Sequence, residues 1–150
     1  MDVKTAFLNG DLDEEIYMDQ PENFVEYGQE SKVCKLTKSL YGLKQAPKQL
    51  HEKFDSCRIE NGYKSNESDK CIYYKTWENS HIIISLYVDD LLIFGSNLHV
   101  INETKNILRS HFDMKNLGEA NFILGMKITK TCGEIFLNQS HYNEKILKNI

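Results

Sequence analysis

The feature that most constrains this chain is an apolar run from Ile82 to Phe94 that two adjacent carboxylates, Asp89 and Asp90, interrupt. The run is dense in β-branched and aromatic residues, which favour strands. Burying two unpaired carboxylates inside a strand would be costly. The pair therefore lies either in an exposed hairpin turn or beside a cation that offsets its charge. Taken alone, the turn is the commoner explanation, because Asp is a frequent turn residue.

A third acid, Asp2, stands beside another apolar strand candidate near the start of the chain. From there its side chain could meet Asp89 across a sheet. Three converging carboxylates would form a hard-oxygen site suited to Mg²⁺. Taken singly, Asp2 would be an ordinary residue near a terminus, so the magnesium site depends on all three acids coming together.

Hydrophobic periodicity and turn signals predict an alternation of strands and helices along the chain. We expect strands at 6–8, 16–18, 33–40, 71–75, within 81–94, at 122–128 and at 134–138, and helices at 48–61, at 98–112 and from Ser140 onward. Turns are expected at 9–11, 78–80 and 131–133, with Gly62 ending the first helix and Ser140 capping the last. The second helix is amphipathic and should pack on the sheet.

Length and composition fit one globular domain, because 150 residues with 41% hydrophobic content can bury a core. The net charge of −4 and pI of about 5.7 count against gripping phosphates by bulk positive charge. Charge is unevenly spread, however. Lysines crowd one stretch, at Lys32, Lys35, Lys38, Lys44, Lys48 and Lys53, and acids another, at Asp11, Asp13, Glu14, Glu15 and Asp19. A local basic face therefore stays open as an interpretation.

The four cysteines show neither a Cys-x-x-Cys pair nor zinc-site spacing with histidine, so we expect four reduced thiols. No apolar run reaches the length of a membrane span, and no signal-peptide pattern begins the chain. We expect a soluble, intracellular protein without a membrane partner. The abrupt strand at the start and the short helix at the end predict a piece cut from a longer polypeptide.

Five motifs in order resemble those of copia-type retrotransposon reverse transcriptases, and the resemblance covers essentially the whole chain. The motifs are Asp2-Val3-Lys4-Thr5-Ala6-Phe7-Leu8-Asn9-Gly10, Ser39-Leu40-Tyr41-Gly42-Leu43-Lys44-Gln45-Ala46-Pro47, Tyr87-Val88-Asp89-Asp90, Leu117-Gly118-Glu119 with Phe122-Ile123-Leu124-Gly125-Met126, and Leu137-Asn138-Gln139-Ser140-His141-Tyr142. A lone Tyr-x-Asp-Asp is weak evidence, but five ordered motifs are strong.

The resemblance implies an α+β polymerase palm, in which an antiparallel sheet carrying the three acids is backed by the two long helices, with partial fingers and the start of a thumb. The domain would span 1–150 and be truncated at both ends. Asp2, Asp89 and Asp90 would be catalytic. Asp2 and Asp89, with the backbone of Val3, would hold two Mg²⁺ ions, or Mn²⁺, for phosphoryl displacement. Asp90 would act more as an electrostatic neighbour.

The resemblance also assigns a nucleotide site. Its residues would be Val3, Lys4, Thr5, Ala6, Phe7, Tyr41 and Gly42. Phe7 would be the steric gate against a ribose 2′-hydroxyl, although the same ring could simply pack in the core. Gly42 would allow close backbone approach, and Tyr41 would offer a packing surface. Lys44 could contact phosphate or be a solvated surface lysine.

Further along the chain, Lys115 falls near the position of a lysine that protonates the pyrophosphate leaving group in related polymerases. A lysine after a helix's last turn also interacts favourably with the helix dipole without catalytic purpose. The primer grip would comprise Phe122, Leu124, Gly125 and Met126.

Two departures from the family pattern lie on the first expected helix. Leu50-His51 stands where the family carries two aromatics, and Cys57-Arg58 puts a charge on an apolar face. Both suggest drift or a local variant, away from the expected metal site.

The resemblance implies RNA or DNA template with primer, deoxynucleoside triphosphates and the rest of a Pol polyprotein, including integrase and RNase H, as partners. Family behaviour would place the activity in cytoplasmic particles or the nucleus. Two alternatives remain: an inactive remnant or domesticated nucleic-acid-binding module that keeps the palm, and an unrelated α+β protein with a metal-binding turn. The intact acidic triad favours the enzyme, because an empty site gains stability when repelling carboxylates are lost.

Overall fold

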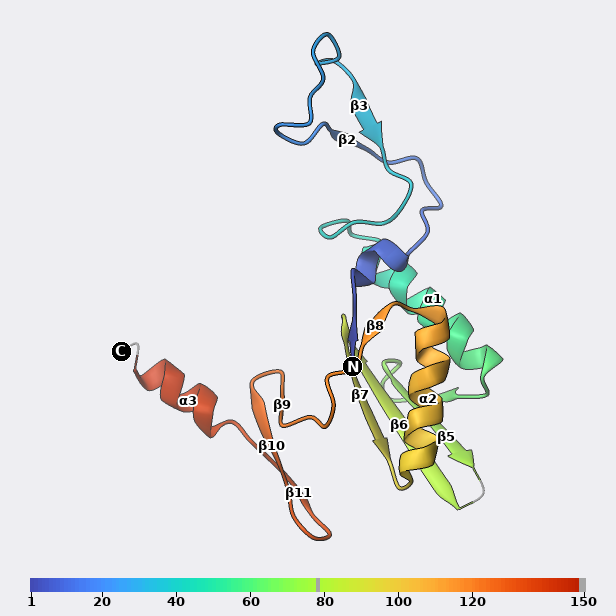
Figure 1. Ribbon diagram of the computed structural model, residues 1–150, viewed down its shortest axis with the longest axis vertical. Helices are drawn as coiled ribbons and strands as arrows, with labels where there is room; N and C mark the ends of the chain where they lie inside the picture. Colours follow the sequence, from blue (N-terminus) through green and yellow to red (C-terminus); the bar gives the residue numbers. More distant parts are fainter. Residues whose placement is uncertain (78, 149–150) are drawn as a thin grey trace. The chain divides into compact units, whose positions relative to one another are not determined.

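The computed structural model describes residues 1–77 and 79–148 and shows a mixed α+β fold with antiparallel sheets (Figure 1). The chain divides into two compact units, Met1–Lys115 and Asn116–Ile150. The expected α+β class is confirmed. The predicted turn at 78–80 lies partly outside the described residues, because Glu78 is among those not described.

The first unit is built on a six-stranded sheet in the order β4-β5-β6-β7-β1-β8. Its strands are β1 (Asp2–Val3), β4 (Lys64–Ser65), β5 (Ile72–Trp77), β6 (Ser80–Tyr87), β7 (Asp90–Gly95) and β8 (Met114–Lys115). Every neighbouring pair is antiparallel. The first residues of the chain thus lie between β7 and β8, which come much later in the sequence.

Two helices, α1 (Ala46–Glu60) and α2 (Leu98–His111), pack on this sheet as the apolar spacing predicts. The Asn97 side chain caps α2 by accepting a hydrogen bond from the His99 N–H. At the centre of the core, the ring of Phe54 stacks on Tyr73 and on Phe112, with centroids 5.5 and 5.2 Å apart. These helices therefore cover one face of the sheet and leave the other open.

The expected strand at 6–8 is wrong, because these residues form the 3₁₀ helix η1 (Ala6–Asn9). Thr5, two residues after β1, has the left-handed conformation φ 47° and ψ 48° at the N-cap of η1. The Asn9 side-chain amide nitrogen then lies 3.4, 3.2 and 3.2 Å from the carbonyl oxygens of Lys4, Thr5 and Ala6. Such local side-chain bonds compete with an extended backbone.

Strands β2 (Tyr17–Asp19) and β3 (Val33–Lys35) form a separate two-stranded sheet. The first lies close to the strand predicted at 16–18, whereas the strand predicted at 33–40 is wrong beyond Lys35, where the backbone is irregular. Around it the two charge-rich stretches pair with each other: Lys35 bonds Glu15, and Lys38 bonds Asp11. These bonds hold the pKa of each carboxyl below its ordinary value. Two of the six lysines of the basic stretch are therefore paired with acids of the acidic stretch.

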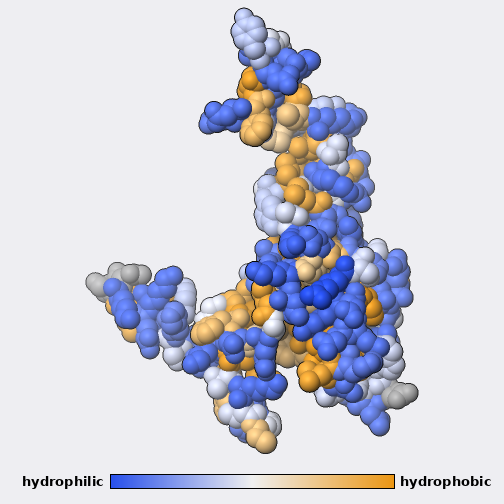
Figure 2. Space-filling view, viewed as in Figure 1, coloured by the Kyte–Doolittle hydropathy of each residue, from blue (hydrophilic) through white to orange (hydrophobic). Residues whose placement is uncertain are grey.

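The second unit holds β9 (Phe122–Ile123), β10 (Met126–Lys130), β11 (Ile135–Asn138) and helix α3 (Ser140–Leu147). The single strand expected at 122–128 is divided, because Leu124 and Gly125 both have positive φ, 48° and 77°. Gln139, rather than Ser140, stands at the N-cap of α3. Figure 2 shows apolar side chains at the surface over β9–β11.

All four cysteines are free thiols, as expected. Among the described residues, no helix is both long and apolar enough to cross a membrane.

Candidate active site

The two adjacent carboxylates of the apolar run lie at the hairpin turn between β6 and β7. Tyr87 pairs with Asp90, which leaves Val88 and Asp89 as a two-residue turn. Val88 has φ 56°, a conformation that hairpins usually give to glycine. A β-branched residue held there stores about 1–3 kcal/mol of strain. The turn predicted from the sequence is therefore present, and it is strained.

Asp2 on β1 lies directly opposite Asp90 on β7. The Val3 N–H donates to the Asp89 carbonyl and the Leu91 N–H to the Met1 carbonyl, both at 2.8 Å. Asp2 and Asp90 are thus a non-hydrogen-bonded pair, the kind whose side chains approach most closely. Like charges directly opposite each other are destabilising. A divalent cation bound beside Asp2 would offset that repulsion, so this surface fits a hard metal ion.

Register also fixes which face of the sheet carries these acids. Val3 is buried opposite Met114 on the helix-covered side, so the neighbouring Asp2 points to the open side. Lys115 is the partner of Asp2 on β8. Because directly opposite residues share a face, one row crosses the open side of the sheet: Lys115, Asp2, Asp90 and Tyr87.

The third acid differs from the other two. Asp89 lies in the turn, where its backbone carbonyl contacts β1. Among the described residues, no group of three or more His, Cys, Asp or Glu side chains is close enough to hold a metal ion. The fold therefore brings Asp2 and Asp90 face to face and Asp89 beside them, without a finished three-carboxylate cage.

The expected nucleotide residues lie in the segment that follows Asp2 and in the loop that meets it at Phe7. Thr5 turns the chain after β1, and η1 then presents Phe7, whose ring meets the ring of Tyr41 edge-on at 4.5 Å between centroids. Gly42 has φ 94°, a backbone conformation that suits glycine. Lys4 is paired with Asp113, its Nζ 3.0 Å from Oδ1.

The expected primer-grip residues, Phe122, Leu124, Gly125 and Met126, all belong to the second unit. There they form the ends of β9 and β10 and the turn between them. Phe122 and Leu124 are exposed.

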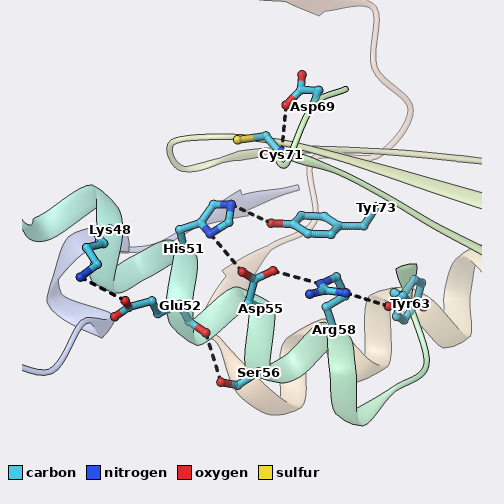
Figure 3. Close-up of polar contacts among 10 residues, drawn as sticks. All are labelled: Lys48, His51, Glu52, Asp55, Ser56, Arg58, Tyr63, Asp69, Cys71 and Tyr73. Atoms are coloured by element: carbon cyan, nitrogen blue, oxygen red, sulfur yellow. Dashed lines mark hydrogen bonds and ion pairs between the residues drawn. The ribbon is translucent and has the colours of Figure 1, made fainter. Parts of the chain in front are cut away.

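Sequence reasoning missed a polar network that joins α1 to β5 (Figure 3). His51 Nδ1 lies 3.3 Å from Asp55 Oδ2, and Arg58 Nε donates to Asp55 Oδ1 at 3.0 Å. The other His51 nitrogen, Nε2, lies 3.2 Å from the Tyr73 hydroxyl. Burial raises the pKa of Tyr73, so this hydroxyl keeps its proton. The spacing of 51, 55 and 58 on one helix face was the available signal.

This network changes the interpretation of the two departures on α1. The Arg58 guanidinium also donates to the Tyr63 carbonyl at 3.2 Å, so its charge is satisfied on the helix that was expected to be apolar there. Leu50 and Cys57 are buried. His51 and Arg58 thus have defined structural partners.

A sheet that carries Asp2 and Asp90 on its open face, beside a hairpin turn that holds Asp89, is suited to metal-assisted chemistry. Comparison with known proteins gives the family. Residues 1–150 match the family model described as "Reverse transcriptase (RNA-dependent DNA polymerase)", and the chain belongs to that family. This confirms the resemblance found in the motifs. Among similar proteins, the Retrovirus-related Pol polyprotein from transposon TNT 1-94 of Nicotiana tabacum is 52% identical over 99% of this chain.

Two further relatives are also described as transposon proteins. The Retrovirus-related Pol polyprotein from transposon RE1 of Arabidopsis thaliana is 32% identical over 95% of the chain, and a putative transposon Ty5-1 protein of Saccharomyces cerevisiae is 35% identical over 97%. The chain spans 11% of the tobacco protein, 10% of the Arabidopsis protein and 47% of the yeast protein. No solved structure matches the chain significantly.

Proposed function

We propose that this chain is the palm of an RNA-directed DNA polymerase that transfers a nucleotide to a primer 3′-hydroxyl. The observation that carries the proposal is the pairing of Asp2 with Asp90, with Asp89 in the adjoining turn. In a family that generally uses divalent metals, two carboxylates facing each other on an open sheet surface have a direct chemical use.

In this proposal Asp2 and Asp89, with the backbone carbonyl of Val3, would hold the metal ions, and Asp90 adds negative charge beside them. Mg²⁺ or Mn²⁺ ions held there would supply the Lewis acidity that lowers the pKa of a primer hydroxyl and the positive charge that offsets a triphosphate. The strained turn at Val88 supports the assignment, because such strain gathers at functional sites.

The nucleotide is held by the segment that follows Asp2. Backbone groups of Val3, Lys4, Thr5 and Ala6 line the triphosphate, and the Phe7 ring excludes a 2′-hydroxyl. Gly42 allows close backbone approach to the incoming nucleotide, and Tyr41 belongs to the same site through the packing of its ring against Phe7. Lys115 gives a proton to the departing pyrophosphate, and its backbone pairing with Asp2 supports this assignment.

The proposed function also implies substrates and partners for this chain. They are deoxynucleoside triphosphates, an RNA or DNA template with primer, and the remainder of the Pol polyprotein, with integrase and RNase H. Phe122, Leu124, Gly125 and Met126 form the primer grip. A fingers region before the chain and a thumb after it would complete the polymerase.

The test is Mg²⁺- or Mn²⁺-dependent incorporation of dTTP on poly(rA)/oligo(dT). We would compare this chain, a version extended upstream, and Asp89→Asn in each. Asp19→Asn, an exposed aspartate on β2, is the matched control. We expect incorporation that Asp89→Asn abolishes and Asp19→Asn leaves intact.

Activity only in the extended version would show that upstream residues complete the site. Absence of activity in both, from folded protein, would contradict the proposal and favour the inactive remnant or nucleic-acid-binding module.

A further inference from the structure

The rings of Phe7 and Tyr41 meet although their residues lie in different segments of the chain. Their centroids are 4.5 Å apart with an interplanar angle of 66°, the edge-to-face geometry that aromatic pairs prefer. Phe7 is partly buried against the core, while Tyr41 is exposed. One side of the Phe7 ring is therefore supported by the core and another by Tyr41.

The backbone that carries Phe7 is fixed by the contacts of the residues on either side of it. Ala6 is fully buried, and the Asn9 side chain binds the carbonyls of the preceding turn. The ring itself has no such tether, because a phenylalanine side chain makes no hydrogen bond. Its direction depends on what it packs against.

The loop that carries Tyr41 is anchored to the same turn. The Ser39 N–H donates to the Gly10 carbonyl at 3.1 Å, and a Cβ on Gly10 would lie only 2.9 Å from the Cβ of Gln49. The Leu43 N–H donates a hydrogen bond to the Leu40 carbonyl at 3.3 Å, which closes a turn around Tyr41 and Gly42. With Gly42 at positive φ this is the pattern of a type II turn.

We propose that Tyr41 is a positioning residue that holds the Phe7 ring in place and thereby sets discrimination between deoxyribonucleotides and ribonucleotides. The inference rests on the proposed function, in which Phe7 excludes the 2′-hydroxyl. Without the Tyr41 ring, Phe7 gains freedom to rotate away from the sugar. Ribonucleotides then enter more readily relative to deoxynucleotides, because only the ribose 2′-hydroxyl presses on the Phe7 ring.

The test compares dATP with ATP, which differ only in the 2′-hydroxyl, on a poly(rU) template with an oligo(dA) primer. We would measure kcat and KM for each nucleotide in the version of the chain that incorporates dTTP. The variants are Tyr41→Ala, Tyr41→Phe, Phe7→Ala and the double variant Phe7→Ala/Tyr41→Ala. Tyr27→Ala, at a fully exposed tyrosine, is the matched control.

We expect Tyr41→Ala to reduce the dATP/ATP ratio of kcat/KM by roughly three- to tenfold, the worth of one aromatic pair. The change should appear chiefly in the KM for ATP. Tyr41→Phe should keep the parental ratio, because the contact uses the ring and not the hydroxyl. Phe7→Ala should reduce the ratio further, and the double variant should match Phe7→Ala, since Tyr41 acts only through Phe7.

Three results would overturn the inference. Tyr41→Ala could change dATP and ATP equally, which would make Tyr41 a direct nucleotide contact. The effects of the two single variants could multiply in the double variant, which would make them independent. Phe7→Ala could leave the ratio unchanged in an active enzyme, which would remove the gate itself. A parent chain inactive on every nucleotide would instead remove the proposed function, and the inference with it.

Discussion

The two units of the chain differ in what they bury. Every buried apolar side chain that the structure describes lies in the first unit, at or before Met114. In the second unit, α3 has no buried residue, and Phe136 and Leu137 on β11 are exposed. Burial of apolar surface is the main favourable term in folding. The first unit therefore carries its own stability, whereas the second has little to hold it together.

The largest expected effect is the loss of Phe54, which is only 2% exposed. Phe54→Ala removes a ring stacked between Tyr73 and Phe112 and should lower the free energy of unfolding by about 3–5 kcal/mol. Urea denaturation followed by circular dichroism measures it. Phe136→Ala, the same change at a ring that is 50% exposed, should cost less than about 1 kcal/mol. Equal losses would contradict the difference between the units.

The next effect is a loss of stability in alkali. Burial raises the pKa of the Cys57 thiol from its ordinary 9.0 to about 11, and burial also raises the pKa of Tyr63 and Tyr73. Below pH 9 both states keep the thiol proton. Between pH 9 and 11 the unfolded state releases it and the folded state does not, so the free energy of unfolding falls with rising pH.

Urea denaturation at pH 7, 9, 10 and 11 tests this, and Cys57→Ala should make the decline shallower. Cys132, exposed in the second unit, supplies the matched control, because Cys132→Ala should leave the decline unchanged. A flat profile in the parent chain would be evidence that Cys57 is not buried.

A smaller effect is expected at two of the positions with positive φ, Val88 in the first unit and Leu124 in the second. Glycine adopts positive φ without the Cβ penalty, so Val88→Gly should raise the free energy of unfolding by roughly 1 kcal/mol. Leu124→Gly should change it less, because the second unit contributes little to the global transition. The urea midpoints of both variants are the measurement, and a loss of stability in Val88→Gly would be the contrary outcome.

The smallest effect should come from deleting residues 116–150. Because the first unit holds the core, its urea midpoint should shift by an amount equivalent to less than about 0.5 kcal/mol. Circular dichroism and hydrogen exchange of the truncated chain would measure this. Collapse of protection in β6 and β7 would show instead that the second unit supports the first.

Sequence predicted the elements whose cause is local. The helices near 48–61 and 98–112 follow from the spacing of apolar residues, and α1 and α2 lie there. The strand predicted at 6–8 failed because Thr5 turns left-handed and Asn9 binds the carbonyls behind it, neither of which periodicity reveals. The long strand at 122–128 failed for a similar reason, since Leu124 has no sequence signal for positive φ.

The site was predictable only in part. Asp89 and Asp90 predict a turn because they interrupt a single apolar segment, and Asp2 was recognised by its motif. The facing of Asp2 with Asp90 required the register of β1 against β7, which the sequence does not contain. The contact of His51 with Tyr73 could not be predicted either, because Tyr73 lies on β5 and not on the helix that carries His51. The roles of these residues in nucleotidyl transfer remain predictions.

The hydrogen bonds of Asn9 also bear on the chemical ageing of the chain. In an Asn-Gly dipeptide the glycine nitrogen attacks the asparagine side-chain carbonyl and expels ammonia, so such asparagines are labile. At Asn9-Gly10 that nitrogen donates its hydrogen to the Phe7 carbonyl at 3.1 Å, and the Asn9 amide is held 3.2 Å from the carbonyls of Thr5 and Ala6. The folded turn thus restrains both reacting groups and protects from deamidation the asparagine that maintains it.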